Sequence, residues 1–445
     1  MERKFRVFFF CILVLLVGLS ATGMSQVKPN YWITVYSNAP AVVTTEKSVQ
    51  LDPGINTLTY PVASSLVPGS IYAQSDTAKV TSLEVKSGIG SGADLLNQKV
   101  GEEITVTSCS AGGCFTTKGK LVALIDGGFL LRISTDQLKW LKEITSFELD
   151  QSTEVSLKPR VLIRMRSKEE RSATLSLNYR TSNLSWSPTY TGVIDEENNL
   201  MELTGSARLA NNSGMGYEDA RITLVAGQPA SRDTPQLFRQ EVKTAAISDQ
   251  VEVGGLFEYH AYSLKKEITI GDGGNLSVPF VSSDSIPIEK TYVYRRSVSG
   301  SVQTHISFDN DDPSGLGVPL AAGTVNLYLQ DEGLRFIGQD EIGNIPTGDR
   351  VELDAGAAFD IQGEARRLSH SKIGENRWKD EIRITISNRK DKPVELQVIE
   401  RLNGDWSIVS SSHEYRQIDS NHIRFDLEVG GNSEIELQYV VDYQY

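Results

Sequence analysis

The sequence predicts an all-β protein built from tandem, immunoglobulin-like β-sandwiches, with a small β-barrel inserted near the N-terminus. Three observations support this class. Apolar and polar residues alternate with a period of two along most of the chain, which puts one face of each strand in a core and the other in water. Clusters of Gly, Pro, Asn and Asp separate these segments at intervals of about 8–12 residues. The sequence contains no coiled-coil heptads and no fixed internal repeat.

The alternation is clearest in residues 346–445, where we predict an immunoglobulin-like sandwich. Ile382, Ile384 and Ile386 alternate with polar residues, and the segment 423–429 follows the same pattern. A polar turn over residues 388–393 separates two of these strands. About seven strands of this kind fit into the region, as an immunoglobulin-like sandwich requires.

The central region is predicted to form a second sandwich from residues 153–227 together with residues 256–345. Leu175, Leu177 and Tyr179 alternate with polar residues in its first part. Between the two parts, residues 228–255 are rich in Pro, Ser, Gln, Asp and Ala and show no periodicity. We therefore expect a solvated linker or long loop there.

The N-terminal part is predicted to contain a β domain over residues 26–91 and the barrel over residues 92–152. The barrel segment combines a short helical turn, about five short apolar strands and Gly-rich turns, a pattern typical of small closed barrels. Such barrels often bind RNA. The formal net charge of −13 over 445 residues argues against nucleic acid as a partner, so a structural insert is the better interpretation.

Residues 1–25 are predicted to be a secretory signal peptide. Arg3, Lys4 and Arg6 precede an apolar segment over residues 7–19, and small residues follow it. An uncleaved anchor is the alternative, but the apolar segment is shorter than the ~20 residues of a typical span. No later segment is apolar enough to cross a membrane. We therefore expect export to the periplasm, the cell surface or the extracellular space, with no membrane span after cleavage.

Two cysteines remain in the mature chain, because Cys11 lies within the predicted signal peptide. Cys109 and Cys114 flank a flexible Ser-Ala-Gly-Gly turn. A disulfide and a pair of free thiols are equally compatible with this spacing, because sequence does not give the Cα separation. A metal site is less favoured, since no second Cys pair or paired His lies nearby.

No catalytic, cofactor-binding or metal-binding residue is predicted. Asp309, Asp311 and Asp312 suggest a calcium loop, but Pro313 stands at a ligand position of the usual motif, which favours a solvated turn. The five histidines do not pair at metal-ligand spacing. Four aromatic residues are candidates for stacking on sugars, although core packing is the favoured interpretation for each; they are Trp186, Tyr190, Trp378 and Trp406.

A family resemblance rests on a series of motifs in a fixed order. They are Trp186-Ser-Pro188-Thr-Tyr190, Ala210-Asn-Asn-Ser213-Gly214, Leu316-Gly317-Val-Pro319, Phe336-Ile-Gly338-Gln-Asp340, Gly356-Ala-Ala-Phe359-Asp360 and Ile399-Glu400. Over residues 155–445 the chain resembles an exported bacterial family with a C-terminal domain of unknown function, some members of which are called mucoidy-inhibitor-like proteins. Residues 27–88 resemble that family's N-terminal β domain. Longer relatives often carry a coiled coil where this chain carries the predicted barrel. The resemblance implies the architecture and brings no catalytic residues.

These observations favour a non-catalytic protein that uses no cofactor and binds a protein or glycan of the cell envelope. The alternative is a hydrolase of envelope polysaccharide or peptide that uses carboxylates from loops. A cleft with two carboxylates would favour the hydrolase. An exposed apolar patch or strand edge would favour a protein partner.

Overall fold

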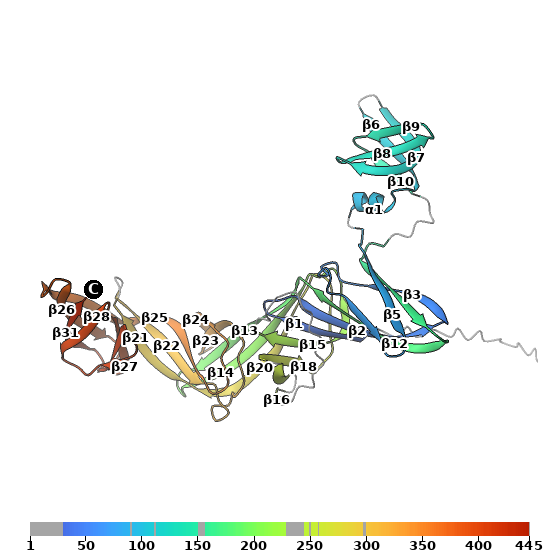
Figure 1. Ribbon diagram of the computed structural model, residues 1–445. Coiled ribbons are helices and arrows are strands. Elements are labelled where there is room, and N and C mark those ends of the chain that lie inside the picture. The colour runs from blue at the N-terminus through green and yellow to red at the C-terminus, as the bar shows by residue number, and fades with distance from the viewer. Residues whose placement is uncertain are drawn as a thin grey trace, which may run out of the picture.

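The computed structural model describes residues 30–89, 91–110, 113–149, 156–227, 244–248, 251–256, 258–296 and 300–444. The predicted signal peptide lies outside these residues. The described chain is nearly all β-structure, as predicted, and its strands form several sheets of a sandwich architecture. Figure 1 shows an elongated array with the C-terminal strands at one end and a small insert projecting near the other.

Five sheets account for the strands. The N-terminal sheet has the order β16 (Thr244–Ser248), β17 (Val251–Leu256), β18 (Tyr259–Leu264), β15 (Tyr217–Ala226), β1 (Asn30–Tyr36), β2 (Ala41–Leu51), β12 (Arg171–Thr181) and β4 (Tyr72–Ser75), and β19 (Ile268–Ile270) also pairs with β15. A small sheet contains β3 (Gly54–Pro61), β11 (Arg160–Ser167) and β5 (Lys79–Lys86). The central sheet has the order β20 (Gly274–Pro287), β14 (Leu200–Asn211), β13 (Leu184–Asp195), β23 (Gly323–Gln330) and β24 (Leu334–Ile342).

The C-terminal sheet and the insert complete the fold. The C-terminal sheet has the order β28 (Asp405–Ser411), β31 (Ser433–Gln444), β26 (Arg377–Asn388), β25 (Arg350–Lys372), β22 (Ser301–Asp309), β21 (Glu289–Arg295), β27 (Val394–Arg401), β30 (His422–Val429) and β29 (Arg416–Gln417). The insert contains α1 (Gly92–Gln98) and a sheet in the order β10 (Ser146–Glu148), β6 (Glu103–Ser110), β7 (Gly113–Ile125), β8 (Gly128–Ser134) and β9 (Gln137–Leu141).

The N-terminal segment shares its sheets with the central region, in contrast to the separate domain expected over residues 26–91. β1 pairs in parallel with β15, and β11 lies between β3 and β5. Ile33 and Val35 of β1 belong to one hydrophobic core that extends to Leu353. The strands before residue 91 thus bury their apolar faces only together with strands that follow the insert.

The segment expected as a linker over residues 228–255 ends in regular structure. β17 pairs with β18, and its Val251 and Val253 are buried in the large core. These two residues flank Glu252 in a short period-two pattern, which explains why they form a strand. β16 also falls within this segment, whereas residues 228–243 lie outside the described part of the chain.

The two sandwiches are joined by continuous strands, which differs from the expected boundary at residue 346. β21 pairs in parallel with β27, and Tyr292, Tyr294 and Val302 lie in the C-terminal core. β25 contributes Val351 and Leu353 to the large core and Ile361 to the C-terminal core. A strand of 23 residues is long enough to cross both layers.

The prediction of a closed barrel for residues 92–152 is wrong. Among the described strands of the insert, β9 and β10 form the two edges and do not pair with each other, so the sheet stays open. α1 packs on the inner face with Leu96 in the core, and β10 has only three residues. Because α1 covers apolar side chains of the sheet, these residues are buried without closure of the barrel.

Candidate ligand-binding surface

The outer face of the N-terminal sheet carries a row of aromatic and polar residues, one on each of five neighbouring strands. Ile33 and Val35 point into the core, so Trp32 points outward by strand alternation. The strand registers align five residues across the sheet, in the order Arg221, Trp32, Thr44, Asn178 and Tyr72. We call these residues the Trp32 row.

Contacts within the row hold its side chains in place. The Arg221 guanidinium lies 5.7 Å from the centre of the Trp32 ring and 3.2 Å from the Glu267 carboxylate. The Thr44 hydroxyl donates a 2.7 Å hydrogen bond to the Asn178 side-chain carbonyl. Tyr72 is 41% exposed at the far end. Three strand spacings of ~4.8 Å put Trp32 and Tyr72 about 14 Å apart. Of the two polar residues between them, Asn178 is only 8% exposed, so Thr44 is the more accessible.

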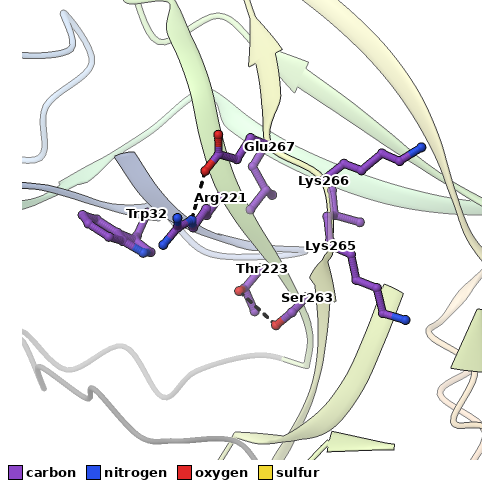
Figure 2. A pocket seen from close by; sticks show the side chains of 9 residues that line it. Trp32, Arg221, Thr223, Ser263, Lys265, Lys266 and Glu267 are labelled. Carbon is purple, nitrogen blue, oxygen red and sulfur yellow. Dashed lines mark hydrogen bonds and ion pairs between the residues drawn. The ribbon is translucent and has the colours of Figure 1, made fainter. Parts of the chain in front are cut away.

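A shallow pocket of about 750 Å³ adjoins Trp32. Figure 2 shows Trp32 at one side, with Arg221 between it and Glu267. The hydroxyls of Thr223 and Ser263 are 3.3 Å apart in this pocket. It therefore offers an aromatic face, a cation, a carboxylate and hydroxyls next to one another, the groups that orient a polar ligand.

A second pocket of about 530 Å³ lies at the loops around Ser65 and Gly214. Its polar groups are largely used by the fold. The Ser65 hydroxyl lies 2.9 Å from the Thr181 hydroxyl, and the Gly214 amide donates to Asp272 at 2.9 Å. We interpret this pocket as the outer surface of a loop-closing network.

The Asp309 loop is organised by internal contacts. Asp309 forms an ion pair with Arg350 at 3.2 Å, and the Asp311 carboxylate accepts a 2.8 Å hydrogen bond from the Ser314 amide. Beside them, the buried Asn310 side chain donates to the carbonyls of Val318 and Pro346. Within the described residues, no group of three or more His, Cys, Asp or Glu is placed to hold a metal ion.

The four predicted aromatic residues divide into two classes. Trp186 and Tyr190 are buried in the large core, and Trp186 contacts Phe280 edge to face at 5.8 Å. Trp406 is partly buried against the C-terminal core, whereas Trp378 is half-buried near the start of β26. His370 stacks on Trp378 with ring centres 4.7 Å apart, and its Nδ1 lies 2.5 Å from Asp380.

Glu400 is a functional candidate that the sequence reasoning missed. It is fully buried in the C-terminal sandwich, where the Tyr439 hydroxyl donates to it at 2.5 Å and Arg296 lies at 3.5 Å. Burial raises the pKa of the Glu400 carboxyl, which the nearby Arg296 only partly opposes. Its second oxygen, Oε1, has no hydrogen-bond partner among the described residues. The signal was present in the sequence, because Glu400 continues the buried positions Leu396 and Val398.

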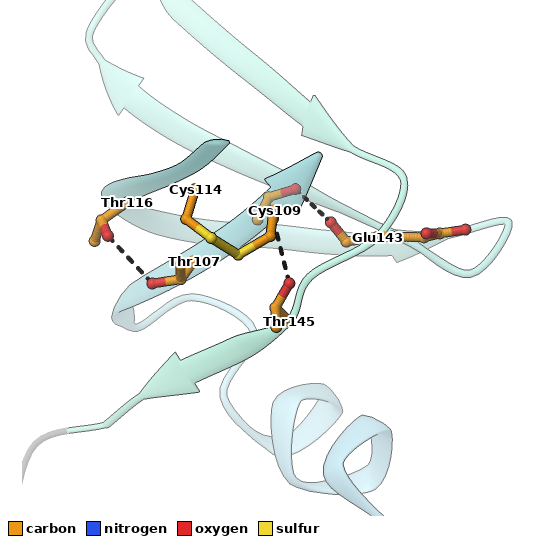
Figure 3. The surroundings of a disulfide bond; sticks show 7 residues. Thr107, Cys109, Cys114, Thr116, Glu143 and Thr145 are labelled. Atoms are coloured by element: carbon orange, nitrogen blue, oxygen red, sulfur yellow. Dashed lines mark hydrogen bonds between the residues drawn. A yellow bond between two sulfur atoms is a disulfide. The ribbon is translucent and has the colours of Figure 1, made fainter. Parts of the chain in front are cut away.

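The structure contains the Cys109–Cys114 disulfide, one of the two alternatives left open by the sequence. The cysteines are directly opposite each other on β6 and β7. Figure 3 shows the bond beside Thr107, Thr116 and Thr145. The Thr145 hydroxyl accepts a 3.2 Å hydrogen bond from the Cys109 amide, and the other two threonine hydroxyls are 3.2 Å apart. The disulfide thus secures the end of this hairpin.

The fold and this surface define an all-β, tandem-sandwich protein with a polar and aromatic sheet face. The chain belongs to the family of the domain of unknown function DUF4139, which matches residues 175–444, more than half of its length. A comparison with curated proteins finds no match. Within the described residues, no helix has both the length and the apolar character to span a bilayer.

Proposed function

We propose that this protein is a non-catalytic, exported protein that binds a glycan of the cell envelope on the Trp32 row. The observation that carries the proposal is the alignment of Trp32 and Tyr72 with Thr44 and Asn178 between them. Aromatic faces pack against the apolar faces of sugar rings, and hydroxyl and amide groups bond their hydroxyls. A row of about 14 Å on one sheet face suits an extended oligosaccharide.

Export is part of the proposal and rests on two observations. The N-terminal sequence has the layout of a signal peptide. Disulfides such as Cys109–Cys114 persist mainly in oxidising compartments. We further propose that the chain is one of the mucoidy-inhibitor-like members of its family, located in the periplasm or at the cell surface.

Binding is favoured over the alternative of hydrolysis because the carboxylates in the two pockets are single and already have partners. In each of the two pockets the described lining includes one carboxylate, Glu267 or Asp272. Glu267 is paired with Arg221, and Asp272 accepts the Gly214 amide. Glycoside hydrolysis uses two carboxyl groups on either side of the substrate bond. Glu400 has a raised pKa, but it is enclosed in the C-terminal core.

The test is calorimetric titration of the mature chain, residues 26–445, with purified oligosaccharide fragments of bacterial envelopes. We expect Trp32→Ala to weaken binding about 30-fold, the ~2 kcal/mol of a central aromatic contact. Tyr72→Ala at the end of the row should weaken it about fivefold, or ~1 kcal/mol. Trp140→Ala, which removes an exposed tryptophan from the insert, is the matched control and should leave the affinity unchanged.

Unchanged affinity in the Trp32 variant would refute this location of the site. Release of reducing sugar ends from the fragments by the wild-type chain would refute the non-catalytic part of the proposal. Both readouts come from the same titrated samples, so the two parts are tested separately.

A further inference from the structure

The insert has an outer sheet face that its own core does not use. Leu121 and Leu131 point inward to the core with Leu96 of α1. On the opposite face, Trp140 is 49% and Leu138 is 53% exposed. This face therefore presents large apolar side chains to the solvent, which a self-contained small domain does not need for its stability.

The geometry of the sheet maintains the exposure of Trp140. Trp140 is paired with Leu130 on β8, and its ring lies over Gly128. A Cβ atom at Gly128 would lie 2.6 Å from the Trp140 Nε1 atom. The glycine therefore leaves room for the ring to lie along the sheet with one side open.

Basic residues flank these apolar side chains on the same face. The registers align Glu103, Lys120, Arg132 and Leu138 in one row across β6 to β9. Lys118, two residues before Lys120, shares this face and forms a 3.2 Å ion pair with Glu103. Arg132 and Lys120 thus lie on the two strands next to Leu138, Lys118 is paired with Glu103, and Glu148 of β10 adds a second carboxylate to this face.

The insert has about the same negative charge density as the rest of the chain, so attraction to an anion has to come from the basic residues on this one face. Residues 91–149 contain six Lys and Arg and seven Asp and Glu, a net charge of −1. The chain as a whole carries −13, so the remaining residues carry −12. The insert projects from the other sheets in Figure 1. Charges beyond the ~10 Å Debye length at 0.1 M salt contribute little at its surface.

We propose that this outer face docks the protein on an anionic phospholipid surface. Trp140 and Leu138 would enter the headgroup region, while Lys120 and Arg132 contact lipid phosphates. Tryptophan favours the membrane interface because its ring is apolar and its N–H is polar. Each basic residue near an anionic surface strengthens adsorption about fivefold. The combination of half-exposed apolar residues with neighbouring cations favours lipid over a purely polar polyanion.

The experiment measures cosedimentation of the mature chain with vesicles of phosphatidylcholine alone or mixed with phosphatidylglycerol. We expect binding only to the anionic vesicles. The double variant K120E/R132E should bind at least 30-fold more weakly, and 0.5 M salt should have a similar effect. Trp140→Ala/Leu138→Ala should also weaken binding at every salt concentration, because it removes the apolar contact.

Two controls separate this face from the rest of the molecule. R366E/R416E reverses two exposed basic residues of the C-terminal sheet and should not change binding. Trp32→Ala should bind vesicles like the wild type, so failure of the glycan proposal leaves this test intact. Equal binding to neutral vesicles, equal loss in R366E/R416E, or binding only to an acidic polysaccharide would overturn the proposal.

Discussion

Several single polar residues are buried in this protein, and most of them form hydrogen bonds with the backbone of nearby loops. Asn211, Asn310 and Asn388 are almost fully buried, and each donates its side-chain amide to backbone carbonyls of nearby loops. These amides satisfy carbonyls that would otherwise be buried without a partner. Glu400 differs from them because one of its two oxygens has no partner among the described residues. The burial of the Glu400 carboxyl therefore makes the stability of the folded protein depend on pH.

Glu400→Gln should stabilise the protein at neutral pH. Burial raises the pKa of the folded carboxyl above its unfolded value of ~4.3, so the folded state binds the proton more tightly. Stability is therefore highest below the unfolded pKa and falls as the pH rises through the folded pKa. Glutamine carries no charge and still accepts from Tyr439, so its variant avoids this loss. Thermal unfolding between pH 4 and pH 8 measures the difference.

The matched control for this measurement is Glu395→Gln on the same strand. Glu395 is exposed, so its substitution should leave the dependence of the melting temperature on pH as in the wild type. A melting temperature of Glu400→Gln below that of the wild type at pH 7 would show that the pair with Arg296 outweighs the burial of the charge.

At the scale of elements, the β6–β7 hairpin depends on its disulfide for part of its stability. Cys109 and Cys114 have a sequence separation of only 5 residues. The chain-entropy model gives about 2 kcal/mol for such a short loop. C109S/C114S should therefore lower the free energy of unfolding of the insert by that amount, as measured by amide hydrogen exchange in β6 and β7. Exchange in β1 and β15 should not change.

Thr107→Ala/Thr116→Ala provides the comparison for the disulfide. It removes the neighbouring exposed pair of hydroxyls and should cost less than about 0.5 kcal/mol. An equal effect of the two double variants would mean that the disulfide adds no constraint of its own.

Strands could be predicted from the sequence where apolar and polar residues alternate locally. The candidate surface could not be predicted in this way. Alternation of Ile382, Ile384 and Ile386 predicts β26, because buried positions recur at every second residue. The pairing of β1 with β15 joins residues about 190 positions apart, and no local pattern specifies it. The Trp32 row exists only through that pairing and those of β2, β12 and β4. Sequence reasoning therefore did not single out Trp32 or Tyr72, whereas the core packing that it favoured for Trp186 is confirmed.

For the whole molecule, the continuity of strands decides which parts can fold alone. The large core includes residues from Ile33 to Leu353, and the C-terminal core begins at Tyr292. The two cores thus overlap in sequence, and β25 contributes to both. The insert has its own smaller core. This arrangement joins the sandwiches through shared strands, while the insert adds a separate surface.

The last prediction follows from this overlap. A fragment of residues 346–445 should not unfold cooperatively, because it lacks Tyr292, Tyr294 and Val302 of its core. Burying such side chains contributes about 2 kcal/mol each, roughly 6 kcal/mol together, which is comparable to the whole stability of a small domain. A fragment of residues 288–445 retains these side chains and should show a cooperative transition in near-ultraviolet circular dichroism. The longer fragment exposes side chains of the large core between residues 288 and 353, among them Phe308, Val325 and Leu327, so it should be measured at low concentration. A cooperative transition in the shorter fragment would show that β21 and β22 are dispensable, and that the boundary read from sequence alternation marks an independent domain.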